Sequence, residues 1–147
     1  MKNMMRLSDL DIAACTVVGE AAAEPWEGKL GVAYVLINRW RTTSGQFARD
    51  DTLATACLRH LQFSVWTAKD PGFSRLYEYG PKGKIYRESM RAVLVAIDGI
   101  EPDPTNGALH YHTVASPEWA KSWPPSWASG HEPSATIARH VFYNDVA

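Results

Sequence analysis

Three glutamates occur close together in the stretch VVGEAAAEPWEG, residues 17–28, whose other residues are mostly apolar. Glu20 and Glu24 are four residues apart, a spacing that puts two side chains on the same face of a helix. On a helical wheel, Glu20 falls at the border of the apolar stripe from Leu10 to Ala21, and Glu24 falls closer to its middle. Mutual repulsion and lost hydration both raise the pKa of a carboxylic acid. Such a group can protonate a leaving oxygen, which is the general-acid role in glycoside cleavage.

A structural role is the alternative for these carboxylates. They could face water or pair with an arginine, for which Arg39, Arg41 and Arg139 are available. Structural ion pairs also gather carboxylates, so the spacing alone leaves both interpretations open. Glu27 lies beyond Pro25, and we expect it to be a solvated residue in the first turn of the following helix.

Two helices are expected to carry this segment. A hydroxyl and a carboxylate in "SDLD" predict a helix that begins with Ser8 as its cap. This helix should end at Pro25, because the residue before a proline is pushed out of the α region. A second helix is predicted from about Trp26 to Arg41, with apolar residues at helical spacing.

The rest of the chain predicts further helices and a small amount of β structure. A third helix is expected from Thr52 to Leu61, with Asp50 or Asp51 as its cap. A fourth is expected at about Ile85 to Asp98, with Gly99 as its C-cap. "ALHYHTV" (108–114) is typical of a short strand, "SPE" (116–118) of a helix start, and "ATIARHVFYND" (135–145) of an extended or hairpin segment.

Length and composition indicate one mainly α (α+β) domain over residues 1–147, with at most a small β element near the C-terminus. The net charge of −1 does not favour nucleic acid as a partner. The sequence contains no stretch of 18 uncharged apolar residues, so we do not expect membrane insertion. The first ten residues lack the apolar region of a signal peptide. We expect a monomer in which Cys15 and Cys57 are buried free thiols, although a single disulfide stays open.

Four blocks of the sequence resemble the germination-type (SleB-like) cell wall hydrolases. Residues 17–39 are similar to the family's opening motif, Gly-Glu-Ala-x-x-Glu-Pro followed by a Gly and an apolar helix that closes with Asn-Arg. "QFS" (62–64), "GALHYHTVASPEWA" (107–120) and "ARHVFY" (138–143) resemble its later blocks, in the same order. Val18, Ala23 and His112 depart from the residues that are common in the family.

The resemblance implies a lysozyme-like helical fold and cleavage of peptidoglycan glycan strands between N-acetylmuramic acid and N-acetylglucosamine. It implies Glu20 as the catalytic acid of a lytic transglycosylase, which also acts as the base that closes a 1,6-anhydro ring. Glu24 would tune Glu20, orient substrate, or serve as the second carboxylate of a hydrolytic muramidase. No cofactor is expected. A lone catalytic domain without a signal peptide suggests a phage-type endolysin, made in the cytoplasm and acting on the host cell wall after its release.

Six further side chains are candidates for contacts with the glycan: Gln62, Ser64, Tyr111, Trp119, Trp123 and Tyr143. The first two could bind N-acetyl groups or simply cap a loop. The two tyrosines could hydrogen-bond the substrate or the acid, and each could equally be a core residue. The irregular segment around "WPPSW" could form an aromatic wall of a sugar groove, although core packing is the simpler expectation for Trp119.

Two other classes of function compete with the glycosidase. "HYH" on a strand puts His110 and His112 on one face, and with His140 they would make a three-histidine zinc site. The protein would then be a zinc-dependent amidase that cuts the peptide stem of peptidoglycan. The third possibility is a non-catalytic wall-binding domain whose aromatic residues bind sugars and whose glutamates are inert.

Overall fold

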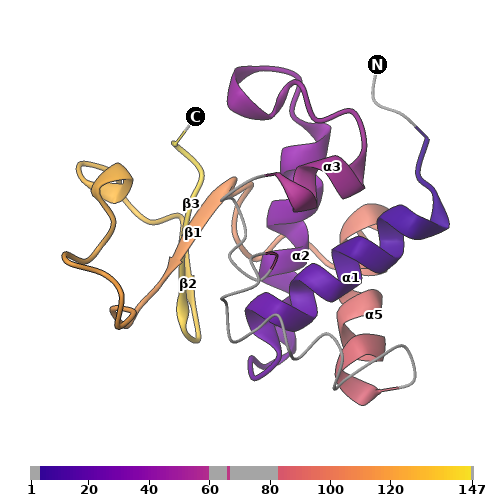
Figure 1. Cartoon of the computed structure of the whole chain (residues 1–147), viewed down its shortest axis with the longest axis horizontal. Coiled ribbons are helices and arrows are strands. Elements are labelled where there is room, and N and C mark those ends of the chain that lie inside the picture. The colour runs from indigo at the N-terminus through magenta and orange to yellow at the C-terminus, as the bar shows by residue number, and fades with distance from the viewer. Residues whose placement is uncertain (1–3, 60–65, 67–82, 147) are drawn as a thin grey trace.

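The computed structural model describes residues 4–59, 66 and 83–146. Helices fill one side of the molecule, and a small sheet lies against them on the other side (Figure 1). The helices are α1 (Leu7–Ala21), α2 (Trp26–Arg41), α3 (Leu53–Leu58) and α5 (Lys84–Asp98), with short 3-10 helices η1 (Gly45–Phe47) and η3 (Ser126–Ala128). The strands are β1 (His110–Thr113), β2 (Ala135–Ile137) and β3 (His140–Tyr143). The expected α+β class, with its β structure confined to the C-terminal part, is confirmed.

Helix α2 is the centre of the fold. Every residue from Gly28 to Ile37 is buried, because α1, α3, α5 and strand β2 all contact this helix. The stretch from Leu30 to Ile37 contains no charged residue, as expected for a helix that is covered all round. Its bounds and those of α5 agree with the predictions. Gly99 is in the left-handed region (φ 69°) and its N–H donates to the Val95 carbonyl at 2.8 Å, which confirms the predicted C-cap.

Helix α1 begins and ends earlier than predicted. Arg6, not Ser8, is its N-cap residue, and the carboxylate of Asp9 accepts the Arg6 backbone N–H at 2.8 Å. The helix stops at Ala21, and the chain then turns, so that the N–H of Glu24 donates to the Ala21 carbonyl at 3.0 Å. The prediction that Glu20 and Glu24 share one helical face is therefore wrong.

A buried lysine stabilises the turn that follows α1. The ammonium group of Lys29 donates to the Ala22 carbonyl at 3.2 Å and also to the Glu24 carbonyl. Backbone carbonyls at the end of a helix have no partner within the helix and must find one elsewhere. A partner from the next helix satisfies these carbonyls, so the turn is stable without the extra helical residues.

Two other local predictions need correction. Thr52 caps α3, since its hydroxyl accepts the Thr55 N–H at 3.0 Å, and the helix ends at Leu58 instead of residue 61. Asp50 instead lies 3.2 Å from the Arg59 guanidinium, which removes it from the helix end. No helix begins at residues 116–118; the Ala120 N–H donates to the Pro117 carbonyl at 3.0 Å and closes a turn.

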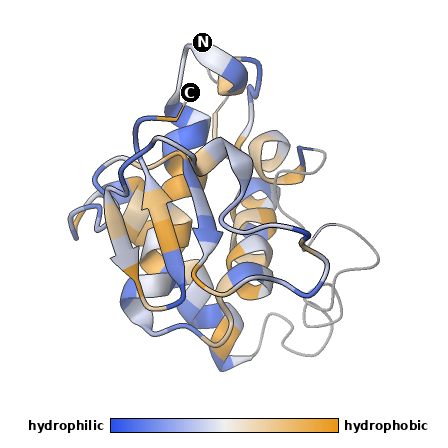
Figure 2. Ribbon diagram, turned by 90° about the vertical axis from the view of Figure 1, so that its left-hand side faces the viewer, coloured by the Kyte–Doolittle hydropathy of each residue, from blue (hydrophilic) through white to orange (hydrophobic). Residues whose placement is uncertain are grey.

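The three strands form an antiparallel sheet in the order β1-β3-β2. Figure 2 has the sheet facing the viewer and shows it lying across the helices. Gly31 of α2 allows this close approach, because a Cβ atom there would be 3.0 Å from the Phe142 ring and 3.3 Å from the Thr105 methyl group. The closeness matters for the site, because the residues on this face of β1 and β3 reach the end of α1.

Both cysteines are free thiols in the structure. Cys57 is buried as expected, and burial raises its pKa to about 12, whereas Cys15 is only partly buried. None of the helices in the described ranges is long and apolar enough to cross a membrane.

Candidate active site

Glu20 lies in the last turn of α1, where the helices meet the sheet, and it interacts there with Tyr111 of β1. Burial raises the pKa of Tyr111 well above its usual value, and the negative charge of Glu20 raises the pKa further. The phenol is therefore protonated at neutral pH and lies close enough to Glu20 to feel the charge of its carboxylate. A hydrogen bond from Tyr111 to the acid, one of the two roles expected for this tyrosine, stays a prediction.

Arg39 brings a positive charge to the same place. It is 4% exposed, and burial lowers its pKa to about 10, with Tyr111 and Glu20 acting in the opposite direction. The guanidinium stays charged at neutral pH and lies 4.6 Å from the centre of the Phe47 ring. Arg39, one of the three arginines named as possible partners for the glutamates, interacts electrostatically with Glu20.

The Asn-Arg pair that closes the opening motif also anchors strand β1. The Asn38 amide donates to the Ala108 carbonyl at 3.1 Å, and Nε of Arg39 donates to the Leu109 carbonyl at 2.7 Å. Two adjacent residues of α2 therefore hold the two carbonyls just before β1, which positions Tyr111 beside Glu20. The motif was visible in the sequence, but this role was not, because its partners lie about 70 residues away.

Glu24 faces a different residue. Its side chain is buried, and its Oε1 lies 3.2 Å from Nδ1 of His140, which is 3% exposed. This distance permits a hydrogen bond, but the ring does not point at the oxygen, so the contact is a close polar approach. Burial, then the positive charges of His112 and Arg139, lower the pKa of His140 to about 4, so the imidazole is neutral at neutral pH.

The opposite face of the sheet carries a group of aromatic rings. Nδ1 of His112 lies 2.8 Å from the Thr113 carbonyl, and its Nε2 lies 2.9 Å from the Tyr143 hydroxyl. A carbonyl only accepts, so Nδ1 of His112 carries a proton and donates to Thr113. Tyr143 is buried and its hydroxyl is used within the protein. Its contact with a glycan therefore stays a prediction.

Trp119 and Trp123 form part of the surface next to this aromatic group. The simpler expectation for Trp119, core packing, is wrong, because the residue is 77% exposed. Its ring is nearly perpendicular to that of Trp123, with 6.1 Å between the ring centres. Trp123 is held in place because its indole N–H donates to the Thr113 carbonyl at 2.8 Å. Gln62 and Ser64, the other candidates for glycan contacts, lie outside the described residues.

The three histidines of the zinc hypothesis do not converge. His110 and His112 share one face of β1, as the sequence predicted. His140 pairs with Thr113, and opposite residues of an antiparallel pair share a face, so His140 lies on the other side of the sheet. In the described part of the chain, no three His, Cys, Asp or Glu side chains are grouped to hold a metal ion. The donor set does not fit the zinc site that an amidase would need.

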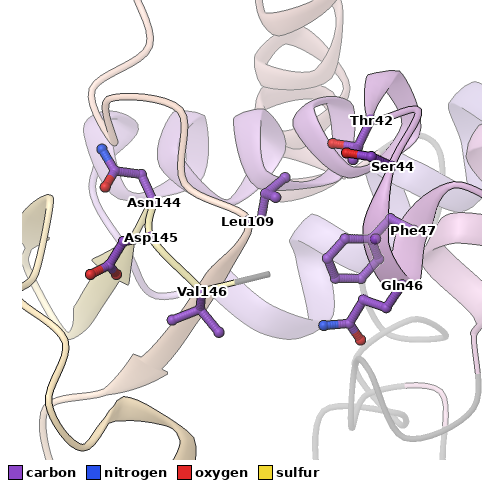
Figure 3. Close-up of a pocket in the computed structure, with 9 residues that line it drawn as sticks. Thr42, Ser44, Gln46, Phe47, Leu109, Asn144, Asp145 and Val146 are labelled. Atoms are coloured by element: carbon purple, nitrogen blue, oxygen red, sulfur yellow. The ribbon is translucent and has the colours of Figure 1, made fainter.

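A pocket that the sequence did not indicate lies between η1 and the end of β3 (Figure 3). Its lining combines hydroxyl, amide and carboxylate groups with apolar side chains, from Thr42, Ser44, Gly45, Gln46, Phe47, Leu109, Asn144, Asp145 and Val146. The Gln46 amide nitrogen lies 3.2 Å from Nε2 of His110. Through Phe47 the pocket adjoins Arg39, and therefore the surroundings of Glu20.

The model of one protein family, described as Cell Wall Hydrolase, matches residues 23–143. The chain belongs to this cell wall hydrolase family. The match confirms the resemblance found in the sequence blocks. It contains Glu24, the Asn-Arg pair and Tyr111, but it begins three residues after Glu20. The assignment of Glu20 therefore depends on the motif and on the geometry described above.

Two curated relatives of this cell wall hydrolase are spore cortex-lytic enzymes. The one from Halalkalibacterium halodurans is 28% identical over 141 residues, which are 93% of this chain and 35% of that enzyme. The one from Bacillus subtilis is 30% identical over 139 residues, 92% of this chain and 37% of that enzyme. The chain thus spans little more than a third of the length of these relatives.

Two solved structures have the same fold. The catalytic domain of the germination-specific lytic transglycosylase SleB from Bacillus anthracis aligns with a TM-score of 0.67 and 25% identity, over 97% of this chain and 99% of that domain. The catalytic domain of the Bacillus cereus SleB protein aligns with a TM-score of 0.69 and 23% identity, over 97% and 94%. The likeness confirms the mainly helical fold that the sequence predicted.

Proposed function

We propose that this chain is a peptidoglycan-cleaving glycosidase of the lytic transglycosylase type, with Glu20 as its acid and base. The substrate would be the bond between N-acetylmuramic acid and N-acetylglucosamine, and the site of action would be the cell wall. Membership of the cell wall hydrolase family and the names of the relatives support this substrate class. The observation that carries the proposal is that the Glu20 carboxylate acts electrostatically on both the Tyr111 phenol and the Arg39 guanidinium, at the junction of α1 and the sheet.

The chemistry needs one carboxyl group that first gives and then takes a proton. Glu20 protonates the glycosidic oxygen as its bond to C1 of the muramic acid breaks. The resulting carboxylate then removes the proton from the 6-hydroxyl of the same sugar, whose oxygen forms the new bond to C1. Tyr111 and Arg39 would stabilise the carboxylate that exists between these two transfers, because a phenol and a positive charge are already close enough to interact with it.

The role of Glu24 bears on the choice between this single-carboxylate route and hydrolysis. A retaining or inverting glycosidase needs a second carboxyl group on the other side of the bond that is cut. Glu24 is buried, and Oε1 of its carboxyl group lies 3.2 Å from Nδ1 of His140. The fallback role of Glu24 as a second catalytic carboxylate stays a prediction, which the products of digestion test.

An exposed tryptophan supports a carbohydrate substrate. A flat apolar ring can stack on the apolar face of a sugar, and Trp119 presents such a ring with Trp123 behind it. We include these two residues in the proposal as contacts to the glycan at a distance from the bond that is cut.

Digestion of purified peptidoglycan followed by mass spectrometry tests the proposal. The wild-type chain should release fragments with 1,6-anhydro-muramic ends. The Glu20→Gln variant should lose about 10³-fold in rate or more and keep its melting temperature, because acid–base catalysis is worth about 10²–10⁴-fold. Glu27→Gln is the matched control, since Glu27 is an exposed carboxylate in the first turn of α2.

The other outcomes identify the competing functions. Free reducing muramic ends would indicate a hydrolytic muramidase, and freed stem peptides with intact glycan would indicate an amidase. Binding to walls without any soluble product would indicate a non-catalytic domain. Near-normal activity of Glu20→Gln would remove Glu20 from its assigned role.

A further inference from the structure

We propose that Glu24 and His140 are a positioning pair that holds Tyr111, and through Tyr111 the carboxyl group of Glu20, in the geometry needed for proton transfer. This inference depends on the function proposed above. It assigns Glu24 a role that does not involve contact with the substrate, and it assigns His140 a role in a glycosidase instead of a metal site.

Four side chains, those of Glu24, His140, Tyr111 and Glu20, form a continuous row across the junction of helix and sheet. Nδ1 of His140 lies 3.2 Å from Oε1 of Glu24. The same imidazole meets the Tyr111 ring edge-on, with 4.9 Å between the ring centres and 84° between the planes. Tyr111 in turn lies close enough to Glu20 to feel the charge of its carboxylate. The row therefore starts in the turn after α1, crosses β3 and β1, and returns to the last turn of α1.

The turn after α1 is built to hold Glu24 in one position. Lys29, itself 4% exposed, binds the backbone carbonyl of Glu24 and lies 3.8 Å from the Glu88 carboxylate. Gly28 leaves room for the side chain, because a Cβ atom there would be 2.9 Å from Cβ of Glu24. Backbone and side chain of Glu24 are thus both restrained by residues of α2.

This arrangement costs stability, which argues for a functional reason. A buried carboxyl group loses hydration, and a charged partner offsets that loss only partly. The imidazole that faces Glu24 is neutral at neutral pH, so the pair lacks the attraction of an ion pair. Apolar residues of similar size would fill the same space at a lower cost in free energy.

The described contacts explain how the pair would affect the rate. The Tyr111 ring packs against the rings of both His140 and Phe142, at 4.9 Å and 5.5 Å between centres. Without a fixed His140, the phenol can tilt and its hydroxyl moves relative to Glu20. A misplacement of about 1 Å can lower the rate of a catalysed step by about 100-fold. The effect should appear in kcat, since none of these groups is proposed to bind substrate.

The first test measures kcat and KM of Glu24→Ala on soluble peptidoglycan fragments. We expect a loss of about 100-fold in kcat, a KM within about threefold of wild type, and a folded protein by circular dichroism. The conservative Glu24→Gln variant, which keeps an oxygen and the volume of the side chain, should recover most of that loss. Glu27→Ala is the matched control from the same segment and should behave as wild type.

A double-mutant cycle then asks whether Glu24 acts through Tyr111. If it does, Glu24→Ala combined with Tyr111→Phe should be no slower than Tyr111→Phe alone, because the shared function is already lost. Losses that multiply would show independent roles and overturn the proposal. If Glu24→Ala fails to fold, the same cycle with His140→Phe, which keeps a ring against Tyr111 but removes Nδ1, decides the question.

The failure of this inference can be separated from the failure of the proposed function. If the wild-type chain cuts no glycosidic bond, the proposed function is wrong. If the wild-type chain does so and Glu24→Ala has the same kcat, the proposed function stands and the positioning role is wrong.

Discussion

Glu20 and Glu24 have the same chemistry, but the residues around them separate their roles. Glu20 is half-buried and has a phenol and a guanidinium beside it, which suits a group that must change its charge during a reaction. Glu24 is 7% exposed and faces a neutral imidazole. At the residue scale, the surroundings of each glutamate therefore distinguish the proposed catalytic residue from its neighbour, because both are the same amino acid.

The Tyr111→Phe variant tests the surroundings of Glu20 directly. The change removes one hydroxyl and keeps the ring that packs against His140 and Phe142. A hydrogen bond to a charged group contributes about 1.5–3 kcal/mol, so we expect kcat to fall roughly 10- to 100-fold with the fold intact. Rate measurements on peptidoglycan give the result. Tyr86→Phe is the control, because its hydroxyl binds Asp11 near the other end of α1. Equal rates for the two variants would contradict the assignment.

At the scale of elements, the site exists because α2 brings α1 and the sheet together. Its residues Asn38 and Arg39 hold the chain just before β1, and Lys29 and Gly28 shape the turn that follows α1. Gly31, midway along the same helix, lets β2 and β3 lie close to it. One buried helix thus determines the relative positions of all the proposed catalytic and positioning groups.

Gly31→Ala should disturb this contact. The added methyl group would lie 3.0 Å from Phe142 and 3.4 Å from Ile137, both of which are buried. Overpacking costs about 1–3 kcal/mol, and alanine regains at most about 1 kcal/mol as a better helix former. We expect the free energy of unfolding to fall by about 1 kcal/mol, with a loss of activity, as measured by urea denaturation and peptidoglycan digestion. A variant as stable as wild type would show that the sheet can shift without cost.

At the scale of the whole molecule, the fold encloses imidazoles that it keeps neutral. Burial is the main cause that lowers the pKa of His140 and of His110 to about 4. In the unfolded chain these groups titrate near 6.5. The unfolded state therefore binds more protons than the folded state between these two values. This contribution to stability is complete above about pH 6.5 and is lost as the pH falls toward 4.

The pH dependence can be measured by comparing wild type with His140→Phe. The free energy of unfolding of the wild type should fall by roughly 2–3 kcal/mol more than that of the variant between pH 7 and pH 4.5, because the variant lacks this titration. Urea denaturation at both pH values provides the numbers. Parallel losses in the two proteins would mean that His140 titrates normally in the folded state.

Local signals in the sequence were sufficient for several parts of this protein. The apolar period and the terminal glycine predicted α2 and α5, and the alternation in "HYH" predicted the faces of β1, because these patterns act over a few neighbouring residues. The ordered blocks indicated the family, and the motif singled out Glu20. Each of these features is encoded within a short stretch of chain.

The tertiary structure alone decided what each carboxylate faces. Helix α1 ends before Glu24, so the helical wheel does not describe that residue, and its carboxyl group lies beside His140. Tyr111, far along the chain, became the partner of Glu20. A local pattern specifies the direction of a side chain relative to its own helix or strand. The group that meets it comes from another element, and only the packing of the whole chain brings the two together.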